Sequence, residues 1–265
     1  MKRARGRAVA LVATALASIA IVLALPRIPQ DPAYHHLADG RPWLGIPNAL
    51  NVLSNAAFAV VGIVGLVALF RPGVVRLRQG RERWAYACFF AGIALTSLGS
   101  AYYHLAPSNA RLLWDRLPMT LGFMGLLAAM LGERVDMTLG SRVLVPLLGL
   151  GVASVLYWGA TERMGAGDLR PYALVQFAPA PLIVMLLAAW PPRYTRGGDY
   201  VAVLAVYGLA KMLEWLDRPI FELGRVVSGH TLKHLVAAGA AGLVLRMLWR
   251  RTPVADVRRG ELALV

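Results

Sequence analysis

The sequence contains few charged residues and a single cysteine. Charged side chains make up 16% of the 265 residues, whereas hydrophobic ones make up 58%, and the mean hydropathy is +0.57. A composition this apolar excludes an ordinary soluble domain. The lone Cys88 has no second cysteine with which to form an internal disulfide, so it gives no information about the redox compartment. The composition therefore indicates a protein that is embedded in lipid.

Strand-like alternation of apolar and polar residues is absent as well, and this excludes a membrane β-barrel. The apolar residues instead form long runs, and about 20 such residues cross a hydrocarbon core of about 30 Å as a helix. We therefore predict an all-α, polytopic transmembrane helix bundle with eight spans. They cover approximately residues 8–26, 50–70, 84–104, 117–132, 142–160, 171–190, 200–216 and 230–249.

Acidic residues are scarce, 14 against 28 lysines and arginines, and the formal net charge is +14. Most of the basic residues fall on one side of the predicted bundle, in the N-terminal MKRARGR, in RPGVVRLRQGRER at 71–83 and in the C-terminal tail. The positive-inside rule then predicts that both termini are cytoplasmic. No basic patch remains that would suit a nucleic acid, and we expect the protein in a bacterial inner membrane.

The first apolar run allows two interpretations. A basic start before an apolar core is typical of a signal peptide, but VLALPRIPQD lacks a small-x-small cleavage site and favours a retained anchor. We expect a cytoplasmic tail and an anchor span in residues 1–29, a membrane domain in 30–250 and a cytoplasmic tail in 251–265. Cleavage would leave seven spans in an unchanged orientation.

Polar residues are scarce inside the predicted spans and gather near their outer ends. Such side chains are costly in lipid, so they face the bundle interior, pair with one another and mark functional sites. The expected site therefore lies toward the outer face of the membrane. The polar layer comprises Asn48, Asn51, Ser54, Asn55, Ser100, Tyr103, His104, Asp115, Tyr157, Tyr172, Gln176, Lys211, Glu214, Asp217, His230 and His234.

Three of the five histidines fall in this layer with helical spacing. His230 and His234 are four residues apart, as are Ser100 and His104, so each pair lies on one face of a helix. Two such helices that meet in a bundle can bring three imidazoles together, which is a common ligand set of catalytic zinc. A nearby carboxylate, Asp115, could then take a proton from the reacting water.

Each of these residues also has a structural interpretation. A histidine pair at the end of a span is often interfacial, and Asp115 could cap a helix. The asparagines could join helices through hydrogen bonds. Lys211 and Glu214, three residues apart, could neutralise each other inside the bundle. His35 and His36 lie in an outer loop and are expected at the surface.

Four motifs together resemble the alkaline ceramidase family, which belongs to the CREST superfamily of seven-span membrane hydrolases. That superfamily also includes the progestin and adiponectin receptors. The resemblance extends over roughly residues 30–250. The motifs are NVLSN at 51–55, GSAYYH at 99–104, WDRLPM at 114–119 and SGHTLKHL at 228–235. The resemblance implies a seven-span core, to which the run at 8–26 adds one N-terminal span.

The resemblance also implies chemistry at named positions. Zinc would be bound by His104, His230 and His234. Ser100 would help to stabilise the oxyanion, and Asp115 would act as the general acid/base or position the reacting water. The implied reaction is hydrolysis of the amide of ceramide or a related N-acyl lipid, which releases a fatty acid and a sphingoid base. The partner would thus be a membrane lipid.

A calcium site is a second implication, and here the chain departs from the family. The family binds Ca²⁺ through an acidic N-terminal segment, whereas DPAYHHLADGRPWLGIPN contains only two acidic residues. Calcium prefers several carboxylates. The candidate Ca²⁺ ligands are therefore reduced to Asp39, Asn48 and Asn51.

Two other functional classes remain open. A receptor of the progestin/adiponectin type would hold the metal structurally and would be expected to carry larger soluble regions. A proton or ion transporter would need polar residues in both halves of the membrane, and the cytoplasmic halves here are almost entirely Leu, Val, Ala and Gly. The sequence does not indicate an oligomeric state.

Overall fold

The computed structural model describes residues 2–254, and regular secondary structure within that range is helical apart from two isolated β-bridges. This confirms the all-α fold class. The elements are α1 (Lys2–Ala24), the 3₁₀ helix η1 (Pro32–His35), α2 (Ala49–Leu53), α3 (Ala56–Phe70), α4 (Glu82–Leu105), α5 (Asn109–Arg134), α6 (Met137–Arg163), α7 (Arg170–Phe177), α8 (Pro179–Ala189), α9 (Asp199–Trp215), α10 (Asp217–Gly224) and α11 (Gly229–Arg250).

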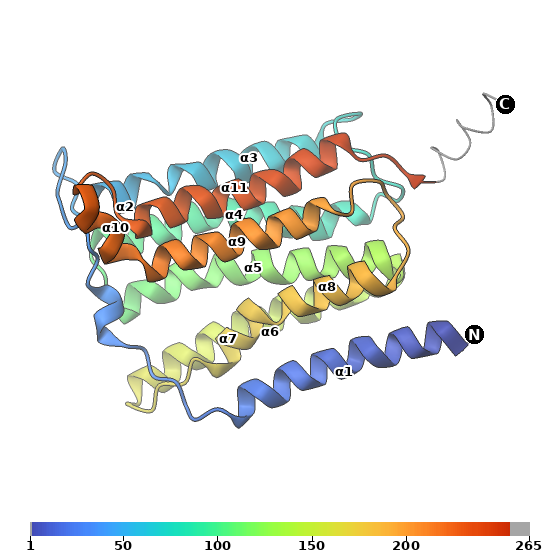
Figure 1. Ribbon diagram of the computed structural model, residues 1–265, viewed down its shortest axis with the longest axis horizontal. Coiled ribbons are helices and arrows are strands. Elements are labelled where there is room, and N and C mark those ends of the chain that lie inside the picture. Colours follow the sequence, from blue (N-terminus) through green and yellow to red (C-terminus); the bar gives the residue numbers. More distant parts are fainter. Residues whose placement is uncertain (1, 255–265) are drawn as a thin grey trace.

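Six segments within the described range are long and apolar enough to cross a membrane, which makes this a membrane-embedded bundle. They are Arg5–Ala24, Ala49–Phe70, Glu82–Leu105, Met137–Arg163, Arg170–Ala189 and Gly229–Arg250. The other two predicted spans fall in α5, which has charged residues at both ends, and in α9, which has 17 residues. Both run alongside the six (Figure 1), and the count of eight spans stays a prediction.

Two of the predicted spans are interrupted. The second is divided into α2 and α3 at Ser54 and Asn55, where polar side chains bond to backbone carbonyls of the same segment. The sixth is divided into α7 and α8 at Ala178, directly before Pro179. Proline has no N–H to donate, so the helical hydrogen-bond ladder is interrupted here, although Ala178 itself keeps helical backbone angles.

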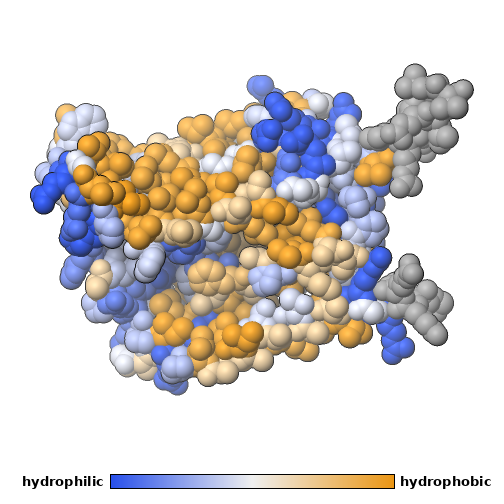
Figure 2. All heavy atoms as spheres, in the orientation of Figure 1, coloured by the Kyte–Doolittle hydropathy of each residue, from blue (hydrophilic) through white to orange (hydrophobic). Residues whose placement is uncertain are grey.

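The helices run lengthwise through the molecule, so the bundle has two ends (Figure 1). One end holds η1, α2 and α10, whereas the N-terminal end of α1 and the C-terminal end of α11 lie at the other. Hydrophobic side chains cover much of the face shown in Figure 2, and hydrophilic ones concentrate at the two ends. This distribution fits a bundle whose middle contacts lipid.

Close helix contacts at two glycines shape the end that holds α2 and α10. A Cβ atom on Gly99 of α4 would collide with the carbonyl of Trp114 in α5, and one on Gly229 of α11 would collide with the carbonyl of Leu213 in α9. The absence of a side chain at these positions allows the backbones to approach. Because Ser100 and His230 directly follow these glycines, the contacts bring polar residues of four helices close together.

Candidate metal centre

Three buried histidines form a cluster at this end of the bundle. One ring nitrogen from each of His104, His230 and His234 lies within 4.8 Å of the others, and none of the three residues is more than 4% exposed. His104 belongs to the last turn of α4, and the other two belong to the beginning of α11. The structure thus brings together the histidines that the spacing singled out.

The separations within the cluster suit a metal ion. Nε2 of His104 and Nε2 of His230 are 3.2 Å apart. Two nitrogens that share a tetrahedral zinc at about 2.0–2.1 Å would be separated by roughly 3.3–3.4 Å. Nε2 of His234 and Nδ1 of His104 are buried without a hydrogen-bond partner in the described residues. An unsatisfied buried nitrogen costs free energy, so a cation bound by Nε2 of His234 would remove one such cost.

The side chain of Ser54 contacts Nδ1 of His234. The Ser54 hydroxyl donates to the carbonyl of Asn51 at 3.2 Å, and its oxygen lies 2.8 Å from Nδ1 of His234. When the hydroxyl proton points to Asn51, the oxygen accepts a hydrogen bond from the Nδ1–H group of His234. Nε2 is then the unprotonated nitrogen, which is the form that a metal ligand needs.

Backbone ends near the cluster are held by polar side chains. Asp217 accepts a hydrogen bond from the His230 N–H at 2.7 Å, and Ser228 caps α11 by accepting from the Thr231 N–H. The side chain of Asn48 donates to the carbonyl of His104 at 2.8 Å, at the end of α4. These bonds satisfy backbone groups that a helix end leaves without partners. They also hold in place the helix ends that carry the histidines.

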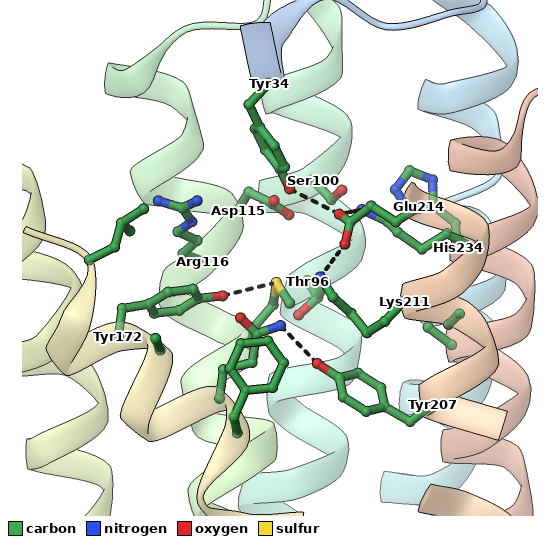
Figure 3. Close-up of a pocket in the computed structure, with 18 of the residues that line it drawn as sticks. Tyr34, Thr96, Ser100, Asp115, Arg116, Tyr172, Tyr207, Lys211, Glu214 and His234 are labelled. Carbon is green, nitrogen blue, oxygen red and sulfur yellow. Dashed lines mark hydrogen bonds and ion pairs between the residues drawn. The ribbon is translucent and has the colours of Figure 1, made fainter. Parts of the chain in front are cut away.

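Ser100 and Asp115 line a cavity of about 340 Å³ beside the histidines. His234 also lines it. In Figure 3, Ser100 and Asp115 lie between α7, which carries Tyr172, and the side of the cavity formed by Glu214 and His234. Both residues are buried. The structure thus places Ser100 and Asp115 in one cavity with a member of the histidine cluster.

A second, almost wholly apolar cavity of about 130 Å³ adjoins the first. Both cavities are lined by Thr96, Met119 and Tyr207, among other residues. The second extends among α4, α5, α8, α9 and α11, where Phe89 and Ile183 contribute to its wall. The cavity that Ser100 and Asp115 line is therefore adjacent to an apolar space in the bundle interior.

Lysine and glutamate side chains form a charged network on the α9 and α11 side. Glu214 accepts from both Lys211 and Lys233, and also from the hydroxyl of Tyr34 at 3.0 Å. The mutual neutralisation of Lys211 and Glu214 is therefore observed. Lys233 also lies 3.1 Å from Nε2 of His230, so its charge faces the candidate metal ligands. Glu214 offsets that charge.

Sequence reasoning did not single out Lys233, Tyr34 and Arg116, which all line the cavity beside the histidines. Lys233 and Arg116 were both visible inside the quoted motifs SGHTLKHL and WDRLPM, one directly before a histidine and the other directly after Asp115. Their positions within motifs were the available signal. Tyr34 gave no signal, because only the fold brings η1 over the cavity.

The three candidate calcium ligands lie in one region but have other partners. Both carboxylate oxygens of Asp39 accept from the Arg41 guanidinium, at 2.7 and 2.8 Å, and this hydrogen bonding lowers the pKa of Asp39. Asn51 donates to the Asp39 carbonyl and accepts from the Thr231 hydroxyl. A Ca²⁺ ion would have to displace Arg41, and its binding stays a prediction.

The two loop histidines differ from each other. His36 is exposed, as expected. The expectation was wrong for His35, which is half-buried: its ring nitrogens lie 3.0 Å from the hydroxyl of Tyr103 and 2.9 Å from the side-chain oxygen of Asn109. The physical reason is that the loop folds inward and packs η1 against α4 and α5.

Neither a scan against models of known protein families nor a search of curated proteins finds a match for this chain. Function must therefore be inferred from the motifs and from the geometry of the site.

Proposed function

We propose that this protein is an integral membrane, zinc-dependent amide hydrolase that acts on ceramide or a related N-acyl lipid. The observation that carries the proposal is the cluster of His104, His230 and His234, buried beside a cavity that Ser100 and Asp115 line. A metal that is only structural would need the histidines alone, whereas a hydrolase also needs a proton acceptor and a hydrogen-bond donor at the reacting group.

The chemistry of the donor set fits Zn²⁺. Imidazole nitrogens are good zinc ligands, and three of them leave a fourth position for water or substrate. A bound Zn²⁺ would polarise an amide carbonyl and would lower the pKa of water bound beside it to about 7. Nε2 of His234 is buried without a hydrogen-bond partner in the described residues, and it is unprotonated in the tautomer whose Nδ1–H donates to Ser54, which supports its assignment as a ligand.

The side chains in the cavity have distinct roles in this proposal. Asp115 takes the proton of the attacking water and passes it to the amide nitrogen as the C–N bond breaks. The Ser100 hydroxyl donates a hydrogen bond to the carbonyl oxygen as negative charge develops there. One C–O bond forms and one C–N bond breaks, so the products are a fatty acid and a free amine.

The apolar cavity supports a lipid as the substrate. Its walls consist mainly of Phe, Ile, Leu, Ala and Met side chains. It shares several lining residues with the cavity that Ser100 and Asp115 line. An acyl chain bound there would place the amide of the lipid beside Ser100 and Asp115. Polar side chains at that end can replace the hydrogen bonds that the amide otherwise makes with water.

The proposed topology has eight spans, cytoplasmic termini and a site that faces the outer side of a bacterial inner membrane. It is supported by the position of the histidine cluster at the end of the bundle opposite to the N-terminal end of α1 (Figure 1). The basic segment 71–83 lies between α3 and α4, at the same end of the bundle as the N-terminal end of α1. Basic loops favour the cytoplasmic side.

The experiment that tests the proposal measures zinc and activity on the same samples. The wild-type protein, purified in a neutral detergent, is compared with the double variant His230→Ala/His234→Ala, and fatty acid released from labelled ceramide and from other labelled N-acyl lipids, including anionic ones, is quantified. About one zinc per chain with hydrolysis, both lost in the variant, is the expected result. Zinc without hydrolysis of any N-acyl lipid would overturn the enzyme assignment and favour a progestin/adiponectin-receptor-like protein with a structural metal. No zinc would overturn the metal site.

A further inference from the structure

Arg116 of α5 is a buried cation surrounded by aromatic rings. Its guanidinium carbon lies 4.3 Å from the centre of the Trp158 ring, 4.9 Å from that of Tyr172 and 5.8 Å from that of Tyr34. The residue is 7% exposed, and its Nη2 atom donates to the side-chain oxygen of Gln30 at 2.7 Å. The rings and Gln30 hold the guanidinium in place but carry no formal negative charge.

Arg116 has no direct ion-pair partner among the described residues, although Asp115 lines the same cavity. No carboxylate in residues 2–254 forms an ion pair with it, and its Nη1 atom is buried without a hydrogen-bond partner there. A buried charge that lacks both a partner and full hydrogen bonding is costly. Glu214 is already shared by two lysines, so it cannot balance the guanidinium.

Arg116 lines the same cavity as Ser100, Asp115 and His234. Figure 3 shows Arg116 and Tyr172 on one side of that cavity and Glu214 and His234 on the other. A ligand that presents its amide to Ser100 and His234 could therefore extend a second polar group toward Arg116 across the cavity.

We infer that Arg116 is an anion subsite that binds a carboxylate or phosphate on the head group of the lipid. The position of the amide in the cavity rests on the proposed function, whereas the preference of Arg116 for an anion does not. The preferred substrates would then be N-acyl lipids whose amine part carries a negative charge, rather than neutral ceramides. Guanidinium groups bind both anions through paired hydrogen bonds, which explains why Nη1 remains available.

The experiment measures binding of three dodecyl ethers that end in a carboxylate, a phosphate or a hydroxyl group. None of them contains an amide, so the hydrolase cannot consume them and a failure of the proposed function does not affect the readout. Affinities are measured by calorimetry on the full-length protein in a neutral detergent. The variants are Arg116→Gln, Arg116→Lys and the control Arg111→Gln. Arg111 is also on α5, but it packs on Tyr102 outside the cavity.

The expected result is that at least one anionic ether binds the wild type roughly tenfold or more tightly than the hydroxyl ether. Arg116→Gln should abolish this preference without lowering the affinity for the hydroxyl ether. Arg116→Lys should keep part of the preference, and Arg111→Gln should keep all of it. Comparison of the carboxylate ether with the phosphate ether shows which anion the site binds more tightly. Equal binding of all three ethers to the wild type would overturn the inference, and this outcome does not depend on whether any variant folds. A preference that persists in Arg116→Gln would overturn it as well.

Discussion

Nε2 of His104 lies 3.2 Å from Nε2 of His230, although 126 residues separate the two histidines in the chain. The contact joins the last turn of α4 to the first turn of α11. The Gly99 contact fixes α4 against α5, and the Gly229 contact fixes α11 against α9. The candidate metal centre therefore depends on the packing of helices from both halves of the sequence.

His104→Ala should remove the metal. Loss of one of three ligands is expected to weaken zinc binding by more than about a hundredfold. Mutation of a residue that only supports a ligand already lowers metal affinity by about 10–100-fold. Zinc per chain is measured by atomic emission after dialysis against a weak chelator. His36→Ala, which changes an exposed histidine, is the control and should keep the metal. Full zinc occupancy in His104→Ala would rule out the three-histidine site.

Asp115→Asn should retain zinc and lose hydrolysis. The amide keeps the size of the side chain but cannot accept a proton from water, so we expect turnover to fall by about 10²–10⁴-fold. Asp31→Asn, which changes an exposed aspartate at the cap of η1, should keep normal turnover. Rates are measured with labelled N-acyl lipid at equal zinc content. Unchanged turnover in Asp115→Asn would exclude the proton-transfer role.

Ser54→Ala should weaken zinc binding without removing a ligand. The hydroxyl lies 2.8 Å from Nδ1 of His234 and orients the ring, and loss of such a support typically costs 10–100-fold in metal affinity. Competition with a chromogenic chelator gives the affinity. Ser141→Ala is a matched control, since Ser141 only bonds to a carbonyl one turn back in α6. Equal affinities of the two variants would contradict the orienting role of Ser54.

The sequence predicted the helical content and the shared face of His230 and His234 because both are governed by local spacing. A period of four residues places His230 and His234 on one face whatever the rest of the chain does. The contact between Glu214 and Lys233 depends instead on how closely α9 and α11 pack, and the breaks at Asn55 and Ala178 depend on local hydrogen bonds and on Pro179. Hydropathy averages over these features, so the runs were predicted as uninterrupted spans.

The environment of Arg116 could not be predicted for a related reason. Its aromatic neighbours come from η1, α6 and α7, which are separated from it by turns whose geometry the sequence pattern does not specify. His35 shows the same limit, because the inward fold of its loop follows from contacts with Tyr103 and Asn109. Arg116 and His35 were therefore missed because their surroundings depend on several loops.

Acid should loosen the attachment of α1. The Arg170 guanidinium lowers the pKa of Asp168 to about 2, and the same guanidinium donates to the carbonyls of Leu23 and Leu25, at and just after the end of α1. Because the folded-state pKa lies below the ordinary value of about 3.9, Asp168 stabilises the fold fully above that value, and the contribution is lost as the pH falls toward 2. We expect Asp168→Asn to lower the Tm by roughly 2–4 °C at pH 6. The difference from wild type should shrink between about pH 4 and pH 2, and a difference that is constant across this range would contradict the pairing.

The two ends of the bundle should face opposite sides of the membrane. The site end includes the turn at Gly165, and the opposite end includes the end of α11 at Arg250. Fluorescent protein that matures only in the cytoplasm should be bright when fused after the C-terminus and dark when fused after Gly165. Alkaline phosphatase, which is active only outside the cytoplasm, should give the reverse pattern. At each fusion point the two reporters control for each other. Failed expression silences both reporters, whereas the topology silences only one of them. Bright fluorescence after Gly165 together with an active phosphatase at the C-terminus would invert the proposed orientation and would place the histidine cluster on the cytoplasmic side.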